Sequence, residues 1–453
     1  MKSEKVNGFT LIELLAVIVI LAIILVIAVP KILNVIEETK KDSLKNTAQL
    51  IAESAEKEKI SNELLEKDDD ITCKRVAKIS DEDYASCKIT FDEEGNAKVS
   101  IIGKGKFDGL AVIDGTKMSS DVIELELPEY GVGKTYIENL YNNEVLRNVN
   151  NLKKDNTPDE NIRYYGSDPN NYVRFNNELW RIIGVFGENI KLVRKDSLGV
   201  LSWDVSDGVN NNWGVNQWGE STDTNGNSYA GSDLQVYLNN MYYGGVEVMC
   251  YKTSNNTTIT CPTKMLDEIS KSLIDNHTWN TGAINLNDST IVNLQSYEMN
   301  TVPFYNAERG TVNGKICSSG NYCNNDVVTR TTTWTGYVGL PYPTDYSYAS
   351  SESVCETNMW DGDIDTTHGR FNMTCKNNNW MHRSNNTWYL SPCTYSFSDG
   401  ASHVWNVGNM GYVSFGSAAY TYAVVPSIYL KSNVLIESGA GTSSDPYILK
   451  AGA

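Results

Sequence analysis

The sequence predicts an α+β protein in which one long N-terminal helix precedes two regions of short strands and loops. Three observations support this prediction. Residues 9–29 form an apolar run that continues into a segment with apolar residues at helical spacing. Short apolar runs bounded by Gly, Asn and Asp follow from residue 86 and are typical of antiparallel strands. The composition also changes near residue 160, which indicates more than one domain.

Composition narrows the class of protein before any motif is considered. The chain has 453 residues, with 38 Lys and Arg against 56 Asp and Glu, so its net charge is −18. This acidic balance argues against nucleic-acid binding, which needs a basic surface to meet phosphates. Nine cysteines are many for a cytosolic protein and indicate an oxidising, extracellular setting.

The N-terminus combines a short basic leader with a long apolar run. Residues 1–8 are polar and include Lys2 and Lys5, whereas the 21 residues 9–29 contain one charge, Glu13. At about 1.5 Å per residue, such a helix spans about 30 Å, the thickness of the bilayer core. A secretory signal peptide has a shorter apolar run that ends at a cleavage site. We therefore expect a membrane-spanning helix over residues 9–30, with the N-terminus in the cytoplasm.

The junction of leader and apolar run, GFTLIE at residues 8–13, resembles the prepilin signature of type IV pilins and pseudopilins. The resemblance implies that a prepilin peptidase cuts between Gly8 and Phe9 and that the new N-terminus is methylated. It also implies that Glu13 pairs with the N-terminal ammonium of a neighbouring subunit, because a carboxylate in hydrocarbon is costly unless paired. Pro30 matches a family position that kinks or locally melts the helix. The expected partners are other pilin subunits, and the expected location is the membrane first and a cell-surface filament afterwards.

The segment after Pro30 predicts the stem of the protein. Apolar residues recur at three- and four-residue spacing between Lys and Glu, which indicates an amphipathic helix to about residue 65. Strands are expected at 88–91, 97–102, 110–113 and 122–127, the first two joined by a turn. A long helix on a small antiparallel sheet resembles the pilin module, which we assign to residues 31–141. The apolar helix positions are Ile32, Leu33, Ile36, Leu44, Ala48, Ile51, Ala52 and Ala55.

A second region begins after a polar, Asn-rich segment at residues 142–161, which we interpret as a linker. All ten Trp and 22 of the 26 Tyr follow residue 160, so residues 162–453 are expected to form a separate surface-displayed domain. Strands are expected at 180–186 and 190–193, and short helices at 232–240, capped by Ser232, and at 266–274. These elements predict a large, loop-rich α+β domain.

Two resemblances concern this second domain. The run at 171–184 resembles the opening of an uncharacterised Firmicutes surface domain. The motifs W-x-L-S-P at 388–392, Gly-Tyr-Val-Ser at 411–414 and V-x-P at 424–426 are similar to the last strands of C-type-lectin-like domains. Formylglycine-generating enzymes share that fold. These motifs are structural, so the resemblance implies a fold and not an activity.

The cysteines form local pairs along the chain, although connectivity cannot be deduced from sequence alone. Zinc would require closely clustered ligands, and C-x2-C is absent. Cys393 is left over, either as a buried thiol or as a replacement partner for Cys355 or Cys375. The candidate disulfides are Cys73/Cys87, Cys250/Cys261, Cys317/Cys323 and Cys355/Cys375.

Two groups of residues are candidates for ligand binding. Trp203, Asp204, Trp213 and Trp218 lie in one Asn-rich loop, where rigid aromatic rings could bind a glycan or protein; the alternative is that the tryptophans fill the core. The sequence from Asp361 through Asp363 to Asp365 begins like a calcium loop. Thr366 replaces the glycine that such a loop needs at its sixth position, so a solvated acidic loop is the alternative.

We predict no catalytic residues and no cofactor beyond this calcium candidate, because the four His show no metal-ligand spacing. The predicted function is a minor type IV pilin, in which a filament subunit displays a binding domain for an unknown glycan or protein. The alternatives are a pseudopilin of a type II secretion or DNA-uptake system, and a surface enzyme with a formylglycine-generating-enzyme-like fold.

Overall fold

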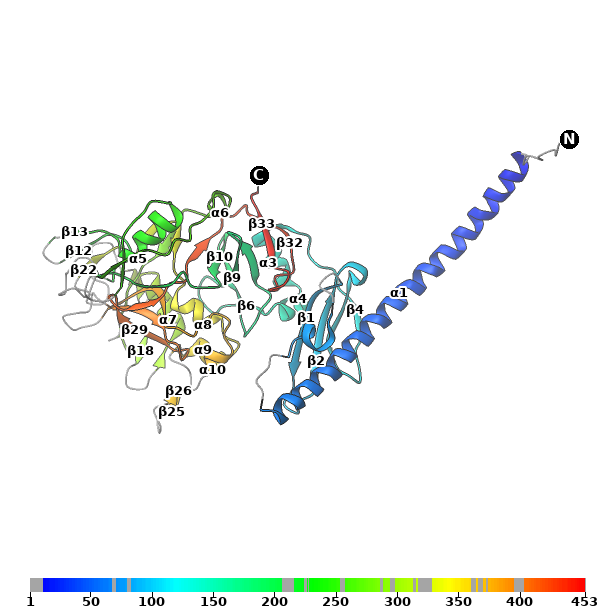
Figure 1. Ribbon diagram of the computed structural model, residues 1–453, viewed down its shortest axis with the longest axis horizontal. Coiled ribbons are helices and arrows are strands. Elements are labelled where there is room, and N and C mark those ends of the chain that lie inside the picture. Colours follow the sequence, from blue (N-terminus) through cyan, green and yellow to red (C-terminus); the bar gives the residue numbers. More distant parts are fainter. Residues whose placement is uncertain are drawn as a thin grey trace. The chain divides into compact units, whose positions relative to one another are not determined.

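The computed structural model divides the chain into two compact units, Met1–Leu127 and Pro128–Ala453, each with its own core (Figure 1). The residues that the structure describes are 11–66, 71–79, 83–205, 216–223, 226, 228–252, 257–285, 288–293, 298–312, 315–316, 328–359, 364–365, 370–371, 374–394 and 403–452.

The first unit begins with a single long helix, α1 (Leu11–Leu64), of 54 residues. Its end agrees with the predicted end near residue 65. The helix is continuous across Pro30, because a proline removes one backbone hydrogen bond and the turns on both sides stay helical. A kink at Pro30, the other effect that the resemblance implies, stays a prediction. Among the described residues, no helix has the length and apolar character of a membrane span.

The second half of α1 packs on a four-stranded antiparallel sheet of order β1-β2-β3-β4 (Figure 1). The helix contributes Leu44, Ile51 and three alanines, all fully buried, to a core that includes Val99 and Val112 of the sheet. The predicted hairpin, its turn and the following strands are therefore confirmed. The elements are α2 (Cys73–Ala77), β1 (Tyr84–Phe91), β2 (Ala97–Gly103), η1 (Gly105–Phe107), β3 (Leu110–Gly115) and β4 (Val122–Glu124).

The predicted linker at 142–161 is wrong, because these residues fold into the second unit. Asn143 accepts a hydrogen bond from Leu146 N at 3.1 Å and caps α4 (Glu144–Val149). After it, β6 (Leu152–Lys154) pairs with β7 (Ile162–Tyr164). The asparagines cap and turn the chain here instead of keeping it extended, and the boundary between the units follows Leu127.

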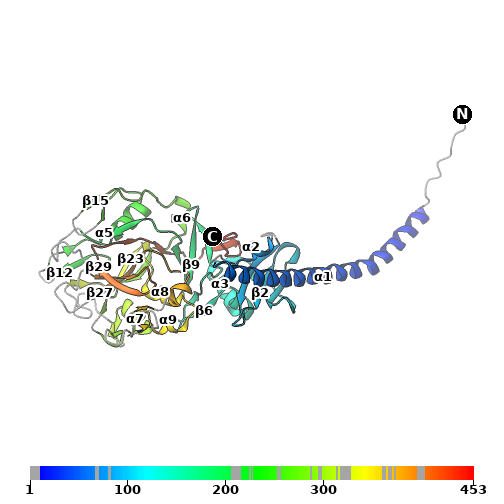
Figure 2. The same cartoon turned by 60° about the horizontal axis from the view of Figure 1, so that its bottom comes forward.

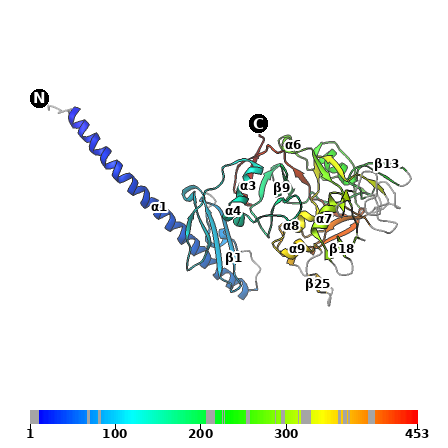
Figure 3. The ribbon, with the colours of Figure 1, turned by 180° about the vertical axis from the view of Figure 1, so that it is seen from behind.

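The main sheet of the second unit has the order β24-β31-β10-β9-β8-β33-β32-β5, with β7 on β9 and β6 on β7. The predicted strand pair is confirmed, with Gly187 in the turn at φ +56°. Helix α3 (Gly133–Asn142) packs against β6, β10 and β32 (Figure 3). The strands are β5 (Gly131–Val132), β8 (Tyr172–Phe175), β9 (Glu178–Phe186), β10 (Asn189–Arg194), β24 (Val338–Gly339), β31 (Ser427–Tyr429), β32 (Leu435–Ser438) and β33 (Tyr447–Lys450).

A second sheet has the order β11-β30-β27-β28-β29, and β17 pairs with β27. Helix α8 (Pro343–Tyr348) packs on β27 and β28 of this sheet (Figure 2). Its strands are β11 (Val200–Ser202), β17 (Ile284–Asn285), β27 (Thr387–Thr394), β28 (His403–Val407), β29 (Val413–Ser417) and β30 (Thr421–Ala423). Both expected motifs at 388–392 and 411–414 therefore contribute to one sheet.

Short helices and small sheets complete the second unit. Ser232 caps α5 (Asp233–Val236) as predicted, and the helix continues as a π-helical turn, η2 (Tyr237–Tyr243). The predicted helix at 266–274 is α6 (Glu268–Leu273). The other helices are α7 (Thr301–Glu308), α9 (Ser353–Thr357) and α10 (Thr374–Asn377). The other strands are β12 (Ser221–Asp223), β13 (Ser228–Tyr229), β14 (Cys250–Lys252), β15 (Thr257–Ile259), β16 (His277–Asn280), β18 (Val292–Asn293), β19 (Glu298–Met299), β20 (Thr311–Val312), β21 (Lys315–Ile316), β22 (Val328–Arg330), β23 (Thr333–Gly336), β25 (Ile364–Asp365) and β26 (Arg370–Phe371).

Candidate functional site

The predicted assembly residues lie at the start of the chain. Gly8 and Phe9 are outside the described residues, and Glu13 and Pro30 lie within α1. The helix exposes apolar side chains near Glu13; Leu11 and Ile12 are 83% and 78% exposed in the single chain. An apolar helix surface of this kind is typical of a segment that is buried by a membrane or by other subunits.

Three of the four predicted cysteine pairs form disulfides in the structure. Cys73–Cys87 joins α2 to β1, Cys250–Cys261 closes the β14–β15 hairpin, and Cys355–Cys375 joins α9 to α10. Cys317 and Cys323 lie outside the described residues. Cys393 is buried in β27 and takes part in none of these three disulfides. This agrees with the predicted buried residue and not with the predicted replacement of Cys355 or Cys375 in their disulfide.

The predicted ligand surface of tryptophans is wrong for the residues that the structure describes. Trp203 and Trp218 are fully buried, and Asp204 is 2% exposed. The Trp203 ring lies 5.0 Å from that of Trp218 and 6.0 Å from that of Trp388, centroid to centroid. These rings form an aromatic core, because burying large apolar side chains is more favourable than leaving them in water. Trp213 lies outside the described residues.

The calcium candidate can be placed only in part. Asp361 and Asp363 lie outside the described residues, and Asp365 is in β25, which pairs with β26. Within the described ranges, no group of three or more His, Cys, Asp or Glu is arranged to hold a metal ion.

A buried cluster of charged side chains, which the sequence analysis did not predict, lies at the centre of the second unit. Arg163 of β7 binds Asp155 through Nε at 2.5 Å and Asp345 of α8 through Nη1 at 2.8 Å. Lys191 of β10 binds the other carboxylate oxygen of Asp345 at 2.6 Å. All four side chains are at most 1% exposed. Two cations therefore balance two anions in a region without solvent access.

The electrostatics of this cluster keep the ion pairs charged. Burial favours the neutral form of Asp345, but the charges of Lys191 and Arg163 outweigh it and hold the pKa of Asp345 below its usual value. Burial lowers the pKa of Lys191 to about 8, with Asp345 acting in the opposite direction. The ion pairs join β7 and β10 to α8 and so fix the packing of these elements. Because the charged side chains are closed to solvent, a substrate cannot reach them.

Glu308, at the end of α7, is a further buried carboxyl group, and it differs from Asp155 and Asp345 because its pKa is raised and theirs are lowered. Burial raises its pKa to about 7, although the nearby charge of Arg309 acts in the opposite direction. Thr344 donates to both carboxyl oxygens, from N at 3.2 Å and from Oγ1 at 2.6 Å. Glu308 therefore holds a proton in the folded protein under mildly acidic conditions.

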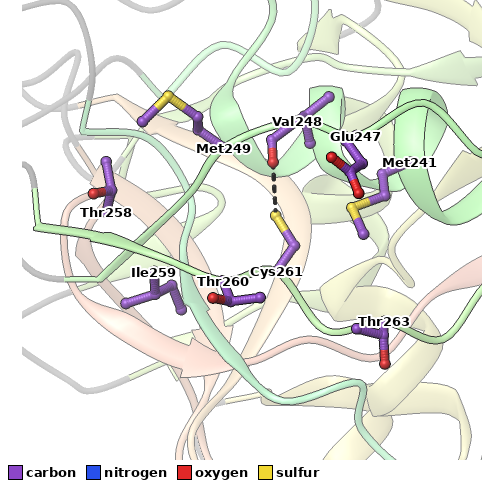
Figure 4. A pocket seen from close by; sticks show the side chains of 9 residues that line it. All are labelled: Met241, Glu247, Val248, Met249, Thr258, Ile259, Thr260, Cys261 and Thr263. Carbon is purple, nitrogen blue, oxygen red and sulfur yellow. Dashed lines mark hydrogen bonds between the residues drawn. The ribbon is translucent and has the colours of Figure 1, made fainter.

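The second unit also has a pocket of about 460 Å³ that is open to solvent (Figure 4). One wall comes from the end of η2 and the chain after it, and the other from β15 and the residues that follow. The pocket is lined by Met241, Glu247, Val248, Met249, Thr258, Ile259, Thr260, Cys261 and Thr263. Its lining combines apolar side chains with Glu247 and three threonines, so the pocket presents both apolar and polar surface.

Comparison with known proteins bears on the N-terminus alone. Residues 5–29 match the family model described as the prokaryotic N-terminal methylation motif. This match confirms the prepilin-like signature at the N-terminus, as known for type IV pilins and pseudopilins. The motif implies a membrane-anchored precursor that is processed by a prepilin peptidase and assembles with other subunits at the cell surface. No curated protein and no solved structure matches the chain.

The sequence analysis missed the charge cluster and the pocket for different reasons. The cluster joins residues as distant as Asp155 and Asp345, which only the tertiary fold brings together. A local signal existed for the pocket, because three apolar residues, Val246, Val248 and Met249, surround Glu247 directly before Cys250 in a polar region. Apolar residues directly before a disulfide-closed hairpin are a pattern that could have indicated this pocket.

Proposed function

We propose that the protein is a minor type IV pilin whose second unit binds a ligand on another surface. The precursor is inserted by the apolar first half of α1 as a single-pass membrane protein and then incorporated into a filament. Pro128–Ala453 is displayed outside the filament. The observation that carries this proposal is the combination of a prepilin motif with a second unit that has its own core.

The size of the second unit favours a sparse position in the filament. Pilin helices pack side by side in a filament, so every lateral neighbour of a subunit needs space for its own globular part. A unit as large as Pro128–Ala453, in addition to the small sheet of Met1–Leu127, would crowd those neighbours if all subunits carried it. A minor subunit, at the tip or scattered along the filament, avoids this conflict.

The main test removes Pro128–Ala453 and keeps the first unit, which has its own core of α1 and the sheet. We expect the shortened protein to enter filaments, as measured by immunogold labelling, and the cells to lose adhesion to the surface that the intact strain binds. Adhesion that persists at the intact level would rule out the binding role.

A matched pair of substitutions tests the assembly step. Glu13→Gln removes the charge that the resemblance assigns to pairing between subunits, whereas Glu53→Gln removes an exposed charge in the second half of the same helix. We expect Glu13→Gln to be processed but not assembled, and Glu53→Gln to assemble. Equal assembly of both variants would contradict the role of Glu13.

The second candidate is a pseudopilin of a type II secretion system, which shares the same N-terminal motif. Requirement for secretion of a protein substrate, without surface filaments, would favour it. A DNA-uptake role is disfavoured by charge, because residues 161–453 carry 17 basic and 26 acidic residues. We propose no catalytic activity; turnover that depends on Cys393 would favour the enzyme alternative instead.

A further inference from the structure

The two walls of the pocket beside the Cys250–Cys261 disulfide are joined by this disulfide and by backbone pairing between β14 and β15. Cys250 pairs with Ile259 in the β14–β15 ladder, and the disulfide closes the same hairpin. Cys261 Sγ lies 3.4 Å from Val248 O, so the second wall is in contact with the first (Figure 4). The two walls are thus fixed relative to each other before any ligand arrives, which lowers the entropic cost of binding.

The surface around the pocket is apolar and exposed. Val246, Met249, Met265 and Ile269 are 63%, 59%, 49% and 79% exposed. Leu266 N donates to Tyr242 O at 2.9 Å, which places the chain before α6 next to the end of η2. Methionine and other apolar side chains in an exposed cluster are typical of surfaces that bind proteins, because methionine adapts its shape to a partner.

One aromatic pair borders the same surface. The rings of Tyr243 and Tyr337 stack with centroids 4.0 Å apart and planes 9° apart. Tyrosine is enriched in protein interfaces, where a rigid ring contributes contact area and its hydroxyl a hydrogen bond. The surface thus has the composition that is typical of the centre of a protein–protein interface. The charged groups beside it determine which kind of partner it can bind.

Glu247 supplies the charge at the pocket. It lines the pocket together with Met241 and Met249, and it has no ion-pair partner among the residues that the structure describes. Lys264 pairs with Glu178 at 2.7 Å and Lys271 with Glu268 at 2.7 Å, and Lys252 of β14 does not line the pocket. The lining of the pocket therefore contains one carboxylate, Glu247, and no Lys or Arg side chain.

We infer that this pocket binds a Lys or Arg side chain of an extracellular protein segment that also presents apolar residues. The methylene stem of Lys or Arg fits against the methionines while its charge meets Glu247. The neighbouring apolar residues of the partner cover Val246, Met265 and Ile269. The excess of acidic residues in residues 161–453 attracts a basic partner during approach.

The test uses the full chain in detergent and four fluorescein-labelled heptapeptides that differ at the central position, which is flanked by leucines. The central residue is Lys, Arg, norleucine or Glu, so that norleucine keeps the apolar stem and loses the charge. Fluorescence anisotropy should show the Lys and Arg peptides binding about fivefold more tightly than the norleucine peptide. The preference should shrink as salt is raised, because the pair is partly exposed.

Substitutions assign the preference to the pocket. Glu247→Gln should reduce binding of the Lys peptide to the level of the norleucine peptide, and Met249→Ser, which removes apolar surface without adding charge, should weaken all four peptides. Glu437→Gln is the matched control, since its side chain is 51% exposed on β32, which contributes no residue to the pocket, and it should leave binding unchanged. Equal affinity of the Lys and norleucine peptides, an unchanged Glu247→Gln variant, or no binding of any peptide would each overturn the inference.

The inference rests on the proposed display of the second unit, but the two fail separately. Glu247→Gln chains should still enter filaments, as seen by immunogold labelling. If filaments form and cells adhere while the peptides do not bind, the pocket inference is wrong and the display role stands. If the peptides bind and no filament contains the protein, the display role is wrong and the pocket stands.

Discussion

The buried carboxyl group of Glu308 makes the stability of the second unit depend on pH. In the folded protein its pKa is about 7, because burial penalises the charged form, against an ordinary value of 4.5. The unfolded chain releases this proton at lower pH than the folded chain does. The stabilising contribution is therefore complete below about pH 4.5 and is lost as pH rises to 7.

The size of the effect follows from the two pKa values. One pKa unit corresponds to about 1.4 kcal/mol, so this carboxyl group should lower the free energy of unfolding by about 3 kcal/mol between pH 4.5 and 8. Glu308→Gln keeps the shape and stays neutral, and Thr344 can still bond to the amide. We expect the variant to gain about 3 kcal/mol over the natural chain across this pH range.

Urea unfolding followed by tryptophan fluorescence measures this difference, because all ten Trp lie in the second unit. Other groups titrate equally in both proteins, so their effects cancel in the comparison. Glu268→Gln, with an exposed side chain, should track the natural chain at every pH. A constant difference between Glu308→Gln and the natural chain from pH 5 to 8 would refute the burial argument.

Three further substitutions test other parts of the structure. Arg163→Met should lower the stability of the second unit by about 3–5 kcal/mol in urea unfolding, because Asp155 and Asp345 lose a buried partner; a loss below about 1 kcal/mol would contradict their pairing. Ile51→Ala should destabilise the first unit by about 2–4 kcal/mol and speed hydrogen exchange in β2, whereas unchanged protection would mean that α1 does not pack there. Trp203→Ala should cost about 3–5 kcal/mol by leaving a cavity; an unaltered urea midpoint would show that the ring is not in the core.

Local patterns in the sequence predicted local structure well. The helix from the apolar run to residue 64, the hairpin at 84–103 and the Ser232 cap all depend on residues close together in the chain. The three observed disulfides close loops with sequence separations of 11 to 20 residues, so neighbouring cysteines were the right partners. These features follow from side-chain spacing and turn chemistry alone.

Predictions that required knowledge of burial were less successful. The Asn-rich segment at 142–161 had the composition of a linker, yet its few apolar residues, such as Leu146 and Leu152, are buried in the second unit. Trp203 and Trp218 had the composition of a binding loop, and the structure surrounds them with other aromatic rings. Composition shows which side chains could be exposed, but the surrounding elements determine which ones are.

By itself, the sequence determined that this chain has a prepilin-like N-terminal motif and a helical stem, because both depend only on residues that are close together in the chain. The tertiary structure decided where the second unit begins, which aromatic rings it buries and how Arg163, Lys191 and Asp345 meet. These features depend on sheet order, which places β33 beside β8 across more than half of the chain. Contacts of that range are set by the burial of whole elements against one another, and no local pattern encodes them.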